Sequence, residues 1–477
     1  MVELNGHELI NGTFVAPFNT LPNTQLNNWH LDRLPEYFWL ALIVTSSEDR
    51  KKCLEDCYRI LEYIVNNIDK DFGTPFFSKI LSYDRDQQTK IYKFISNLGY
   101  KEVLYPLTIQ IRFSDYPVFS SYFYNRLSIK ERLELIEKTL KKTFSHDSFW
   151  STDIRFLSVW SCVLSKKIYF KKGMPVTDAL TNYVNANHED EIMKSYGSLI
   201  RSTEGSLWTI DFKSCFLYKT FWKELNQMSD EKITNYTIND DSSISIDYLN
   251  KIKPIIEYYD ELLANKYPQS DRELVMFGLL NYSYTRFKEM TEHNLFNEPS
   301  GRSCIRSMIE VYLVTIFMLS KEKEKPTIWK EYRIYGAGEY KLTAQIVDSL
   351  GFDSKNTHID KDIIMAFSSS EHDSLFTNME VKYFSNVKMR DLAEKAGEKE
   401  LYAMYQHDSS FDHGLWCAVV ESSLLHSESA SNEYKHTLGI DTPNRLLSVL
   451  NDAIAILRKH IKLIEKEHPL PKRIKYE

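Results

Sequence analysis

Five polar residues in the C-terminal part of the chain have the types and spacing of a small reaction site. Arg306 and Glu310 stand four positions apart, and Ser409 and His413 repeat that spacing with Tyr405 one turn earlier. Residues at i and i+4 share one face of a helix, so each group presents its side chains together. Histidine transfers protons near neutral pH, and arginine stabilises the charge of a phosphate group. We expect both groups to face one another in one polar pocket between helices.

A purely structural role stays open for the same residues. Arg306 and Glu310 interrupt an otherwise apolar helix predicted at 303–319. Charges are costly to bury unless they are paired. An ion pair within this helix would therefore lock its packing without any chemistry, and the sequence leaves both readings open.

Two other patterns are weaker signals. Residues 335–340 (Tyr-Gly-Ala-Gly-Glu-Tyr) carry part of a dinucleotide fingerprint but lack its third glycine, a preceding strand and a βαβ frame. Arg286 and His293 have the spacing of an Arg–His pair in some ribonucleases, but residues seven apart also share an exposed helix face. We expect a helix irregularity or a tight packing site at the first position and an exposed helix surface at the second.

The densest cluster of potential metal ligands comprises His407, Asp408, Asp412 and His413. A metal needs several ligands to converge on one point. On a continuous helix, residues 408 and 412 lie one turn apart, whereas 407 and 413 point in different directions. We expect no metal and no cofactor.

The composition is typical of a globular, mostly helical protein. The chain has 477 residues, of which 43% are hydrophobic and 26% charged, so it has room for two or three domains. Only 15 glycines and 14 prolines are present, which favours long helices over a β-sandwich or a glycine-rich nucleotide fold. The net charge of −7 argues against a sequence-independent nucleic-acid coat but leaves a local basic groove open.

Cysteine usage and the start of the chain indicate a cytoplasmic protein. Of the 6 cysteines, only Cys53 and Cys57 are close together, and their spacing matches neither a zinc knuckle nor a redox motif. Free thiols suit a reducing compartment. Residues 1–5 lack the features of a signal peptide. The longest apolar run, 311–319, is far shorter than the ~20 residues of a membrane span.

Apolar residues recur every three or four positions in nearly every long segment, which predicts an all-α protein of two lobes. Strands are expected only as short pieces in the N-terminal lobe. The segment 104–113 alternates weakly and contains a proline, so we expect an edge strand or a loop there. A turn at 267–270 predicts a boundary between an N-terminal helical domain, 1–268, and a C-terminal helical bundle, 269–477.

The C-terminal domain shows the clearer periodicity. Helices are predicted at the following ranges: 271–293, 303–319, 329–350, 387–396, 400–406, 414–425 and 442–467. The last of these begins with a Thr-Pro pair, a strong helix start signal. Its long apolar stripe either closes the core of its own subunit or meets a second copy across a two-fold axis.

Residues 270–430 resemble an uncharacterised bacterial all-helical family, one of the domain-of-unknown-function groups. The likeness rests on an R-x-x-x-E helix at 306–310 with Trp-Lys-Glu-Tyr-Arg at 329–333. It continues with 386–397, followed by a Y-x-x-x-S-x-x-x-H pattern at 405–413.

The shape of that family resembles the HEPN-like bundles of bacterial toxins and phage-defence proteins. The resemblance implies a metal-independent ribonuclease whose cleft is shared by two subunits. His413 would be the general acid and base, and Arg306 would stabilise phosphate charge. Ser409, Tyr405 and Glu310 would orient them.

One departure from the catalytic HEPN pattern favours a second reading. His407 and Asp408 stand where catalytic members carry an arginine, so Arg306 must supply the positive charge from another helix. The alternative is a non-enzymatic helical module that binds a partner protein or nucleic acid in a defence complex. Under either reading we expect the protein to form a homo-oligomer and to bind RNA, a nucleotide or a partner protein. We expect no association with a membrane.

Overall fold

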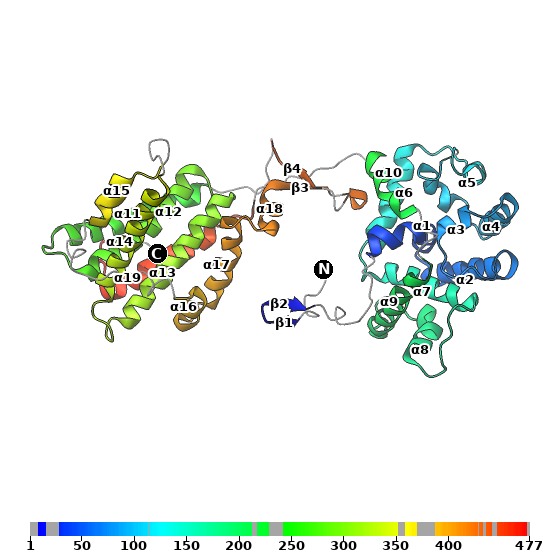
Figure 1. The fold of residues 1–477 in the computed structure, drawn as a ribbon, viewed down its shortest axis with the longest axis horizontal. Helices are drawn as coiled ribbons and strands as arrows, with labels where there is room; N and C mark the ends of the chain where they lie inside the picture. Colours follow the sequence, from blue (N-terminus) through cyan, green and yellow to red (C-terminus); the bar gives the residue numbers. More distant parts are fainter. Residues whose placement is uncertain are drawn as a thin grey trace. The chain divides into compact units, whose positions relative to one another are not determined.

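The computed structural model divides into two compact units, Met1–Ile233 with His426–Lys435 and Thr234–Leu425 with His436–Glu477 (Figure 1). It describes residues 8–15, 28–112, 114–211, 217–228, 242–351, 358–369, 387–427, 429–432, 436–440 and 446–474. Each unit has its own hydrophobic core. The described elements are helices apart from two short two-stranded sheets, which confirms the all-α prediction.

The first unit is a bundle of helices of mixed length. Its longer helices are α1 (Leu34–Thr45), α2 (Arg50–Asn67), α4 (Arg85–Asn97), α6 (Ile129–Thr143), α7 (Phe149–Leu164) and α9 (Ile192–Asp211). Short helices are α3 (Phe77–Leu81), α5 (Pro117–Tyr122), α8 (Pro175–Asn182) and α10 (Phe221–Met228). The remaining helical elements are the π-helical turn η2 (Trp29–Arg33), the 3₁₀ helix η3 (Glu102–Ile109) and the single 3₁₀ turns η4 (Tyr183–Asn185), η6 (Leu217–Lys219) and η9 (Ala430–Asn432). Strand β1 (Glu8–Ile10) pairs antiparallel with β2 (Thr13–Val15).

Helix α1 is the central element of the first unit. All of its residues are buried, since its sequence is apolar all round and such a helix must be covered on every side. Helices α2, α6 and α7 pack against it. Its one carboxylate, Glu36, accepts hydrogen bonds from the backbone N–H groups of Ser78 (3.1 Å) and Leu217 (2.9 Å). The buried charge thereby ties α3 and η6 to the core.

The second unit is built from long helices. They are α11 (Ser242–Ala264), α12 (Asp271–His293), α13 (Pro299–Lys321), α14 (Ile328–Leu350), α17 (Lys399–Asp412) and α19 (Leu450–Glu467). Shorter elements are α15 (Lys361–Ser369), α16 (Met389–Ala396), α18 (Trp416–Ser423) and the strands β3 (Leu424–His426) and β4 (His436–Leu438), which pair with each other. This second sheet lies outside the N-terminal lobe, where we expected the strands.

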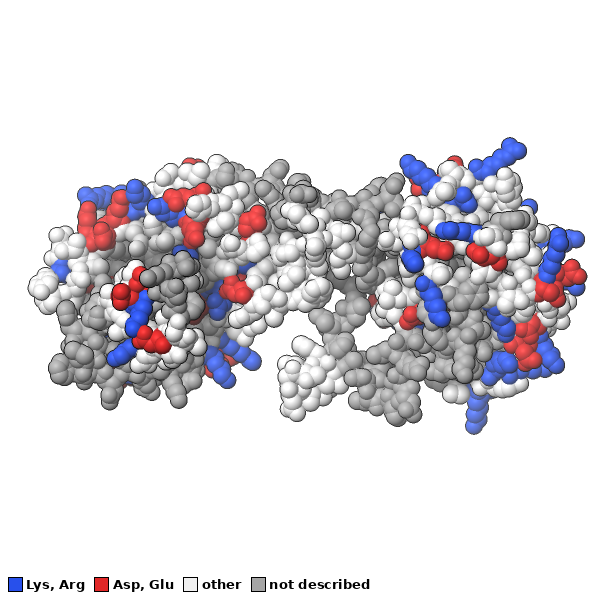
Figure 2. Space-filling view, turned by 45° about the horizontal axis from the view of Figure 1, so that its top comes forward, with Lys and Arg blue, Asp and Glu red and all other residues white. Residues whose placement is uncertain are grey.

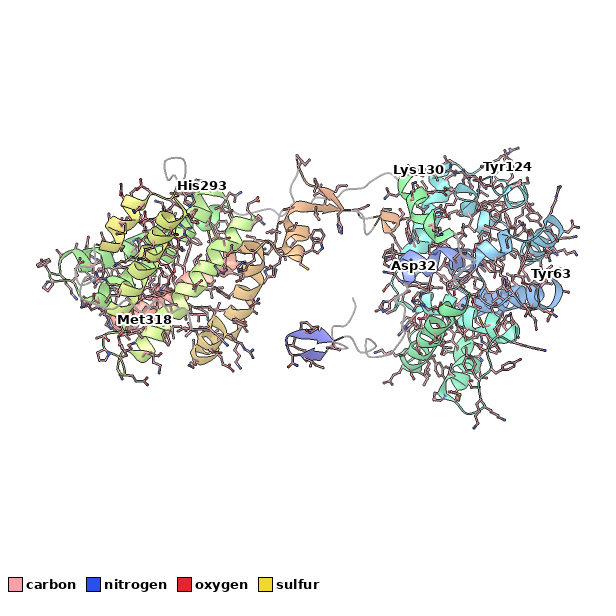
Figure 3. The ribbon with its side chains drawn as sticks, viewed as in Figure 1. Asp32, Tyr63, Tyr124, Lys130, His293 and Met318 are labelled. Atoms are coloured by element: carbon pink, nitrogen blue, oxygen red, sulfur yellow. The ribbon has the colours of Figure 1, made fainter. Side chains whose placement is uncertain are left out.

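Helix α13 is the core helix of the second unit. It packs against α12, α16, α17 and α19. Its length and apolar composition also fit a membrane span. It nevertheless carries Arg302, Arg306 and Glu310 and also contacts α14, so it is a core helix of the second unit. Met318 of α13 lies in this core (Figure 3).

The apolar stripe of α19 belongs to the core of its own unit. The stripe residues Leu450, Ala453, Ile456, Leu457, Ile461 and Ile464 are all buried. The helix starts later than its Thr442-Pro443 signal predicts. Residues 441–445 lie outside the described residues, and 446–449 are not helical. Instead, Leu446 N–H donates to Asn297 O (2.9 Å) and Val449 N–H donates to Phe296 O (3.0 Å), so this segment pairs with the α12–α13 loop.

Two further expectations differ from the structure. Residues 102–109 form the 3₁₀ helix η3 rather than an edge strand or loop, because the buried Leu104 and Leu107 match its three-residue turn. The division between the units precedes α11, whereas we expected a boundary at 268/269. The apolar face of α11 packs on α12, with Tyr259 stacked on Phe277 at 4.9 Å between ring centroids.

Candidate active site

Arg306 joins α13 to α17 at the centre of the candidate site. Its Nε donates to Ser409 Oγ (3.0 Å) and its Nη2 donates to Tyr405 Oη (3.1 Å). The guanidinium also lies over the Tyr405 ring, 5.0 Å from its centroid. Ser409 Oγ in turn donates to the backbone carbonyl of Tyr405 (2.7 Å). The structure thus joins Arg306 of the first polar group to Ser409 and Tyr405 of the second.

Two carboxylates flank the Arg306 guanidinium. Asp412 Oδ2 lies 3.3 Å from Nη1, and Glu310 Oε2 lies 3.9 Å from Nη2. Ser303 Oγ donates to Asp412 from the preceding turn of α13. Burial opposes the charge of Arg306, but Tyr405, Glu310 and Asp412 outweigh it and raise the pKa of Arg306. The site therefore holds a permanent cation whose side chain is 27% exposed, within reach of a ligand at the surface.

A second, deeper polar layer lies along the same helix pair. Asp408 is buried and accepts from His407 Nδ1 at 3.0 Å. Burial raises the pKa of Asp408, and the charges of His407 and Arg302 oppose that shift. Arg302 donates to Leu447 O (2.6 Å) and lies over the Phe411 ring at 5.8 Å. This layer fixes α17 against α13 and the 446–449 segment, and so supports the Arg306 layer above it.

His413 stands at the C-terminal cap of α17. Gly414 follows it with φ +57°, the left-handed conformation that ends many helices. The backbone N–H of His413 donates to Ser409 O (3.2 Å), so both residues share one turn. The His413 side chain is exposed, and within the described residues no hydrogen bond or ion pair joins its ring to Arg306. The structure places His413 beside the Arg306 group without orienting its ring.

The weaker patterns have ordinary structural settings. Gly336 and Gly338 lie inside the continuous helix α14, so no phosphate-binding loop forms there. Arg286 pairs with Glu289 on its own helix at 3.0 Å, and His293 is exposed at the end of α12 (Figure 3). Across the described parts of the chain, no three His, Cys, Asp or Glu side chains gather to hold a metal ion.

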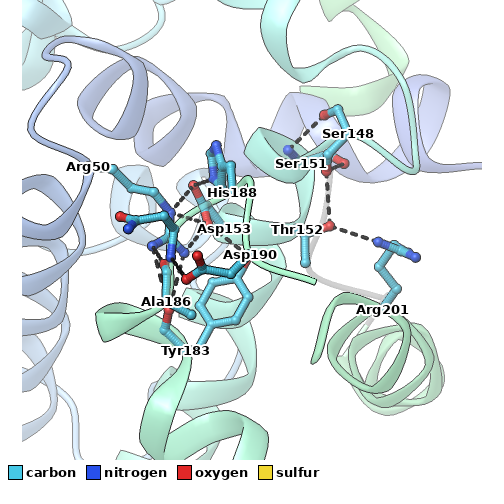
Figure 4. Close-up of polar contacts among 11 residues, drawn as sticks. Arg50, Ser148, Ser151, Thr152, Asp153, Tyr183, Ala186, His188, Asp190 and Arg201 are labelled. Carbon is cyan, nitrogen blue, oxygen red and sulfur yellow. Dashed lines mark hydrogen bonds and ion pairs between the residues drawn. The ribbon is translucent and has the colours of Figure 1, made fainter. Parts of the chain in front are cut away.

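The first unit contains a separate buried polar network around Asp153 (Figure 4). Arg50 makes a two-pronged contact with the Asp153 carboxylate at 2.8–3.1 Å. Tyr183 Oη (2.8 Å) and His188 Nε2 (3.0 Å) bond the same carboxylate, and Arg50 Nη1 also donates to Ala186 O (2.7 Å). The fully buried charge is thereby satisfied by three side chains. This network clamps the segment between α8 and α9 onto α2 and α7.

Part of the chain, mostly within the second unit, is similar to a sequence family. Residues 273–432 match the Family of unknown function (DUF5677). The match spans α12 to η9 and so includes every residue of the Arg306 site. No curated protein and no solved structure matches the chain. The comparison thus supports a domain of unknown function here, and the DUF5677 region brings no assigned activity with it.

Sequence reasoning missed two members of the Arg306 site in the DUF5677 region. Asp412 entered only as a metal candidate, and Ser303 was not considered. Both lie three residues from a recognised member, Asp412 after Ser409 and Ser303 before Arg306. The i,i+3 spacing on a helix was therefore the available signal. Helix α17 runs on to Asp412, which places that carboxylate beside Arg306.

Proposed function

We propose that the second unit is a HEPN-like effector domain that acts on RNA or a nucleotide without a metal, in a bacterial defence or toxin-type system. One observation carries the proposal. Arg306 reaches from α13 to the hydroxyl groups of Tyr405 and Ser409, one turn from the exposed His413. The cation thus contacts α17 one turn before the residue that carries the proton-transferring ring.

The proposed roles follow from the chemistry of RNA cleavage. A base removes the proton from the attacking hydroxyl, an acid protonates the leaving oxygen, and a cation stabilises charge on the phosphate oxygens. His413 serves as the acid or base, and Arg306 serves as the cation. Ser409 and Tyr405 hold the guanidinium in place, and Glu310 restrains it from its own helix.

Expression in bacterial cells tests this proposal. We expect the wild-type chain to arrest growth and degrade RNA, and His413→Ala to do neither, because the variant lacks the proton-transferring ring. His293→Ala is the matched control, since His293 is also an exposed histidine at the end of a long helix. Equal RNA integrity and growth for wild type and His413→Ala would contradict the enzymatic role.

A non-enzymatic binding module is the second candidate, and a specific observation favours it. The Arg306 charge is already opposed by Asp412 and Glu310, which leaves less positive potential for a phosphate. On the described face in Figure 2, basic and acidic side chains are interspersed, and the chain carries a net charge of −7. Binding of a partner protein or nucleic acid that survives in His413→Ala, with no RNA loss in either protein, would support this candidate.

The enzymatic proposal includes a homodimer, because the HEPN-like bundles that this domain resembles share one cleft between two subunits. The apolar stripe of α19 is buried in its own unit, so the dimer must use another surface. Light scattering at micromolar concentration is expected to give twice the mass of one chain. A mass of one chain would reject the shared-cleft form of the mechanism.

A further inference from the structure

An open cavity in the first unit, which we call the Arg132 cavity, is lined by polar side chains from η3, α5, α6 and the loop between α5 and α6. Its volume is about 700 Å³, within the range of roughly 300–1,000 Å³ that is typical of small-molecule sites. Its lining residues all carry hydrogen-bonding side chains, and they are Thr108, Ser120, Ser121, Tyr124, Asn125 and Arg132. Arg132 gives this otherwise neutral lining a positive charge. Such a lining suits a polar ligand that carries a negative charge.

Neutral oxygen atoms hold the Arg132 guanidinium. Its Nη1 donates to Thr108 Oγ1 (2.9 Å) and its Nε donates to Ser128 O (3.4 Å). Within the described residues, no carboxylate forms an ion pair with Arg132, and its Nη2 makes no hydrogen bond. By contrast, Arg50 of the same unit bonds the buried carboxylate of Asp153. Arg132 therefore brings an unpaired charge and open donors to the wall of a cavity.

The position of Arg132 in its helix adds to the cost of this charge. Arg132 is the fourth residue of α6, near the helix end at which backbone N–H groups carry partial positive charge. The Glu131 carboxylate is engaged in the capping box, where its Oε2 accepts from Ser128 N–H (2.7 Å). Burial also lowers the pKa of Arg132. A bound anion would offset both costs.

The oxygen atom that holds Arg132 is itself fixed in place. Thr108 Oγ1 donates to Tyr105 O (2.6 Å) and accepts a second hydrogen bond from Asn125 Nδ2 (3.3 Å). Asn125 also donates to Phe123 O (3.0 Å) and accepts from Leu127 N–H (3.1 Å). These contacts tie the loop between α5 and α6 to η3. The guanidinium is therefore oriented before any ligand arrives, which lowers the entropy cost of binding.

Tyr124 and Ser121 are the exposed members of the lining. The Tyr124 side chain has 76% of its surface accessible and lies at the surface of the first unit (Figure 3). Neither hydroxyl group bonds another residue in the part of the chain that the structure describes. The Tyr124 ring also offers an open face for stacking. These two residues thus provide contacts for the body of a ligand whose anionic group reaches Arg132.

A cavity of the second unit has the opposite charge balance. Its volume is about 480 Å³, and Arg272 and Glu322 belong to its lining. Arg272 donates to Glu322 from Nε (2.8 Å) and to Glu467 from Nη2 (2.6 Å). Two carboxylates of the protein thus neutralise this arginine, and no ligand is needed to do so. The lining of the Arg132 cavity includes no carboxylate among the described residues.

We propose that the Arg132 cavity binds a phosphate monoester of a sugar, with the phosphate on the Arg132 guanidinium and the body of the ligand against Tyr124. The planar donors of arginine match two oxygen atoms of a phosphate, and the charge of arginine is permanent. The neutral hydroxyl and amide groups of the lining suit the hydroxyl groups of a sugar. The ligand is therefore a nucleotide or a sugar phosphate. This site lies in the first unit and is independent of the activity proposed for the second.

Calorimetric titration of the full chain at constant ionic strength tests the proposal, with AMP and glucose 6-phosphate as separate ligands. We expect the wild type to bind and Arg132→Gln to lose about tenfold in affinity, because a charge-assisted hydrogen bond to phosphate is removed. Arg201→Gln is the matched control. Arg201 also donates from Nη1 to a threonine hydroxyl, Thr152 Oγ1 at 3.1 Å (Figure 4), but does not line the cavity. This control should bind as the wild type does.

Tyr124→Ala is a second test variant, and its exposed side chain can be removed without loss of the core. We expect about a fivefold loss of affinity, because the stacking contact with the ligand is lost. Tyr169→Ala is its control, since Tyr169 has 78% of its surface accessible and does not line the cavity. Its affinity should equal that of the wild type.

The two ligands separate the sources of the phosphate, and each order of affinity supports the site. Binding of AMP that is tighter by about tenfold or more identifies a nucleotide, the reverse order identifies a sugar phosphate, and equal affinity identifies the phosphate and sugar that both share. Adenosine and glucose, which lack the phosphate, should bind at least about tenfold more weakly. Four outcomes would overturn the proposal: no binding of either phosphate at about 10 mM, equal losses in Arg132→Gln and Arg201→Gln, full affinity in Tyr124→Ala, or adenosine binding as tight as that of AMP.

Discussion

At the scale of single residues, Arg306 makes its closest contacts across a helix interface and not within its own helix. A pair within α13 would make Glu310 its main partner. The structure instead places the closest contacts across the helix interface, at Ser409 and Tyr405, with Glu310 more distant at 3.9 Å. The i,i+4 spacing of each pair was visible in the sequence. That the two pairs lie close together was inferred from the cost of burying charge. Only the packing of α13 on α17 shows the contact of Arg306 with Ser409 and Tyr405.

Double-mutant cycles on the free energy of unfolding measure whether Arg306 couples more strongly to Ser409 or to Glu310. We expect Arg306→Ala and Ser409→Ala to couple by about 1 kcal/mol, the value of a hydrogen bond to a charged group at a part-exposed site. Arg306→Ala and Glu310→Ala should couple by no more than about 0.5 kcal/mol, as exposed helix pairs do. The reverse order of the two couplings would assign Arg306 to an intrahelical ion pair.

His460 provides a pH-dependent test inside the second core. Its ring contacts Ser283 Oγ (3.0 Å) and Thr315 Oγ1 (3.4 Å), and complete burial lowers its pKa to about 3. Below about pH 6.5 the unfolded chain therefore binds a proton that the folded chain excludes. We expect the stability of this unit to fall by about 1.4 kcal/mol per pH unit as the pH drops from 6.5 toward 4.

Urea unfolding between pH 7 and pH 5 checks this expectation. The pH dependence should be reduced in His460→Gln, which has no group to protonate in the unfolded state. His293→Gln should keep the wild-type dependence, because His293 is exposed in the folded state. Identical slopes for wild type and His460→Gln would show that the histidine is protonated inside the core.

At the scale of elements, the sequence predicted helices well and their ends less well. Apolar spacing located α12, α13 and α14 to within a few residues. The ends depended on contacts with other segments. Helix α19 starts later than the Thr-Pro signal at 442 predicts, because residues 446–449 hydrogen-bond the α12–α13 loop. Helix α17 ends later than predicted, and its last turns make polar contacts with α13. The sequence of η3 was interpreted as an interrupted strand. Both a 3₁₀ helix, with a period of three residues, and a strand, with a period of two, space apolar residues more closely than an α-helix does.

The segment around η9 shows how a remote piece of chain is held on the first unit. The Glu137 carboxylate of α6 accepts from Ala430 N–H (2.6 Å), Ser431 N–H (3.1 Å) and Ser429 Oγ (2.9 Å). We expect Glu137→Gln to raise the hydrogen-exchange rates of the Ala430 and Ser431 amides about tenfold, since a charged acceptor is lost. Mass spectrometry or NMR measures these rates.

Glu134→Gln is the matched control for this contact. Glu134 lies one turn earlier on α6 and is exposed. Its substitution should leave the exchange of the η9 amides unchanged. Equal effects of the two substitutions would show that the net charge of α6, and not the Glu137 contact, protects the segment.

At the scale of the whole molecule, the two separate cores predict two unfolding transitions. Leu61 belongs to the first core and Leu457 to the second, and both are fully buried. Substituting either with alanine is expected to cost about 2–5 kcal/mol and to lower the temperature of its own transition alone. The exposed Leu447, with 74% of its surface accessible, serves as the control, and Leu447→Ala should move neither transition.

Scanning calorimetry of the full chain distinguishes the two transitions. A single transition that both core variants lower equally would mean that the units fold as one. The existence of two helical lobes could be read from apolar periodicity and a turn. The chain path of the units could not, because η9 joins the first core through contacts of Glu137, which no local pattern reveals.

The most direct test of the proposed activity is cleavage of RNA by the purified full chain in the presence of EDTA. We predict that the wild type and His293→Ala cleave RNA at similar rates, because neither a metal nor His293 takes part. His413→Ala should be slower by at least about 100-fold, the usual value of a general acid or base. RNA left intact by the wild type, or cut equally fast by His413→Ala, would contradict the account.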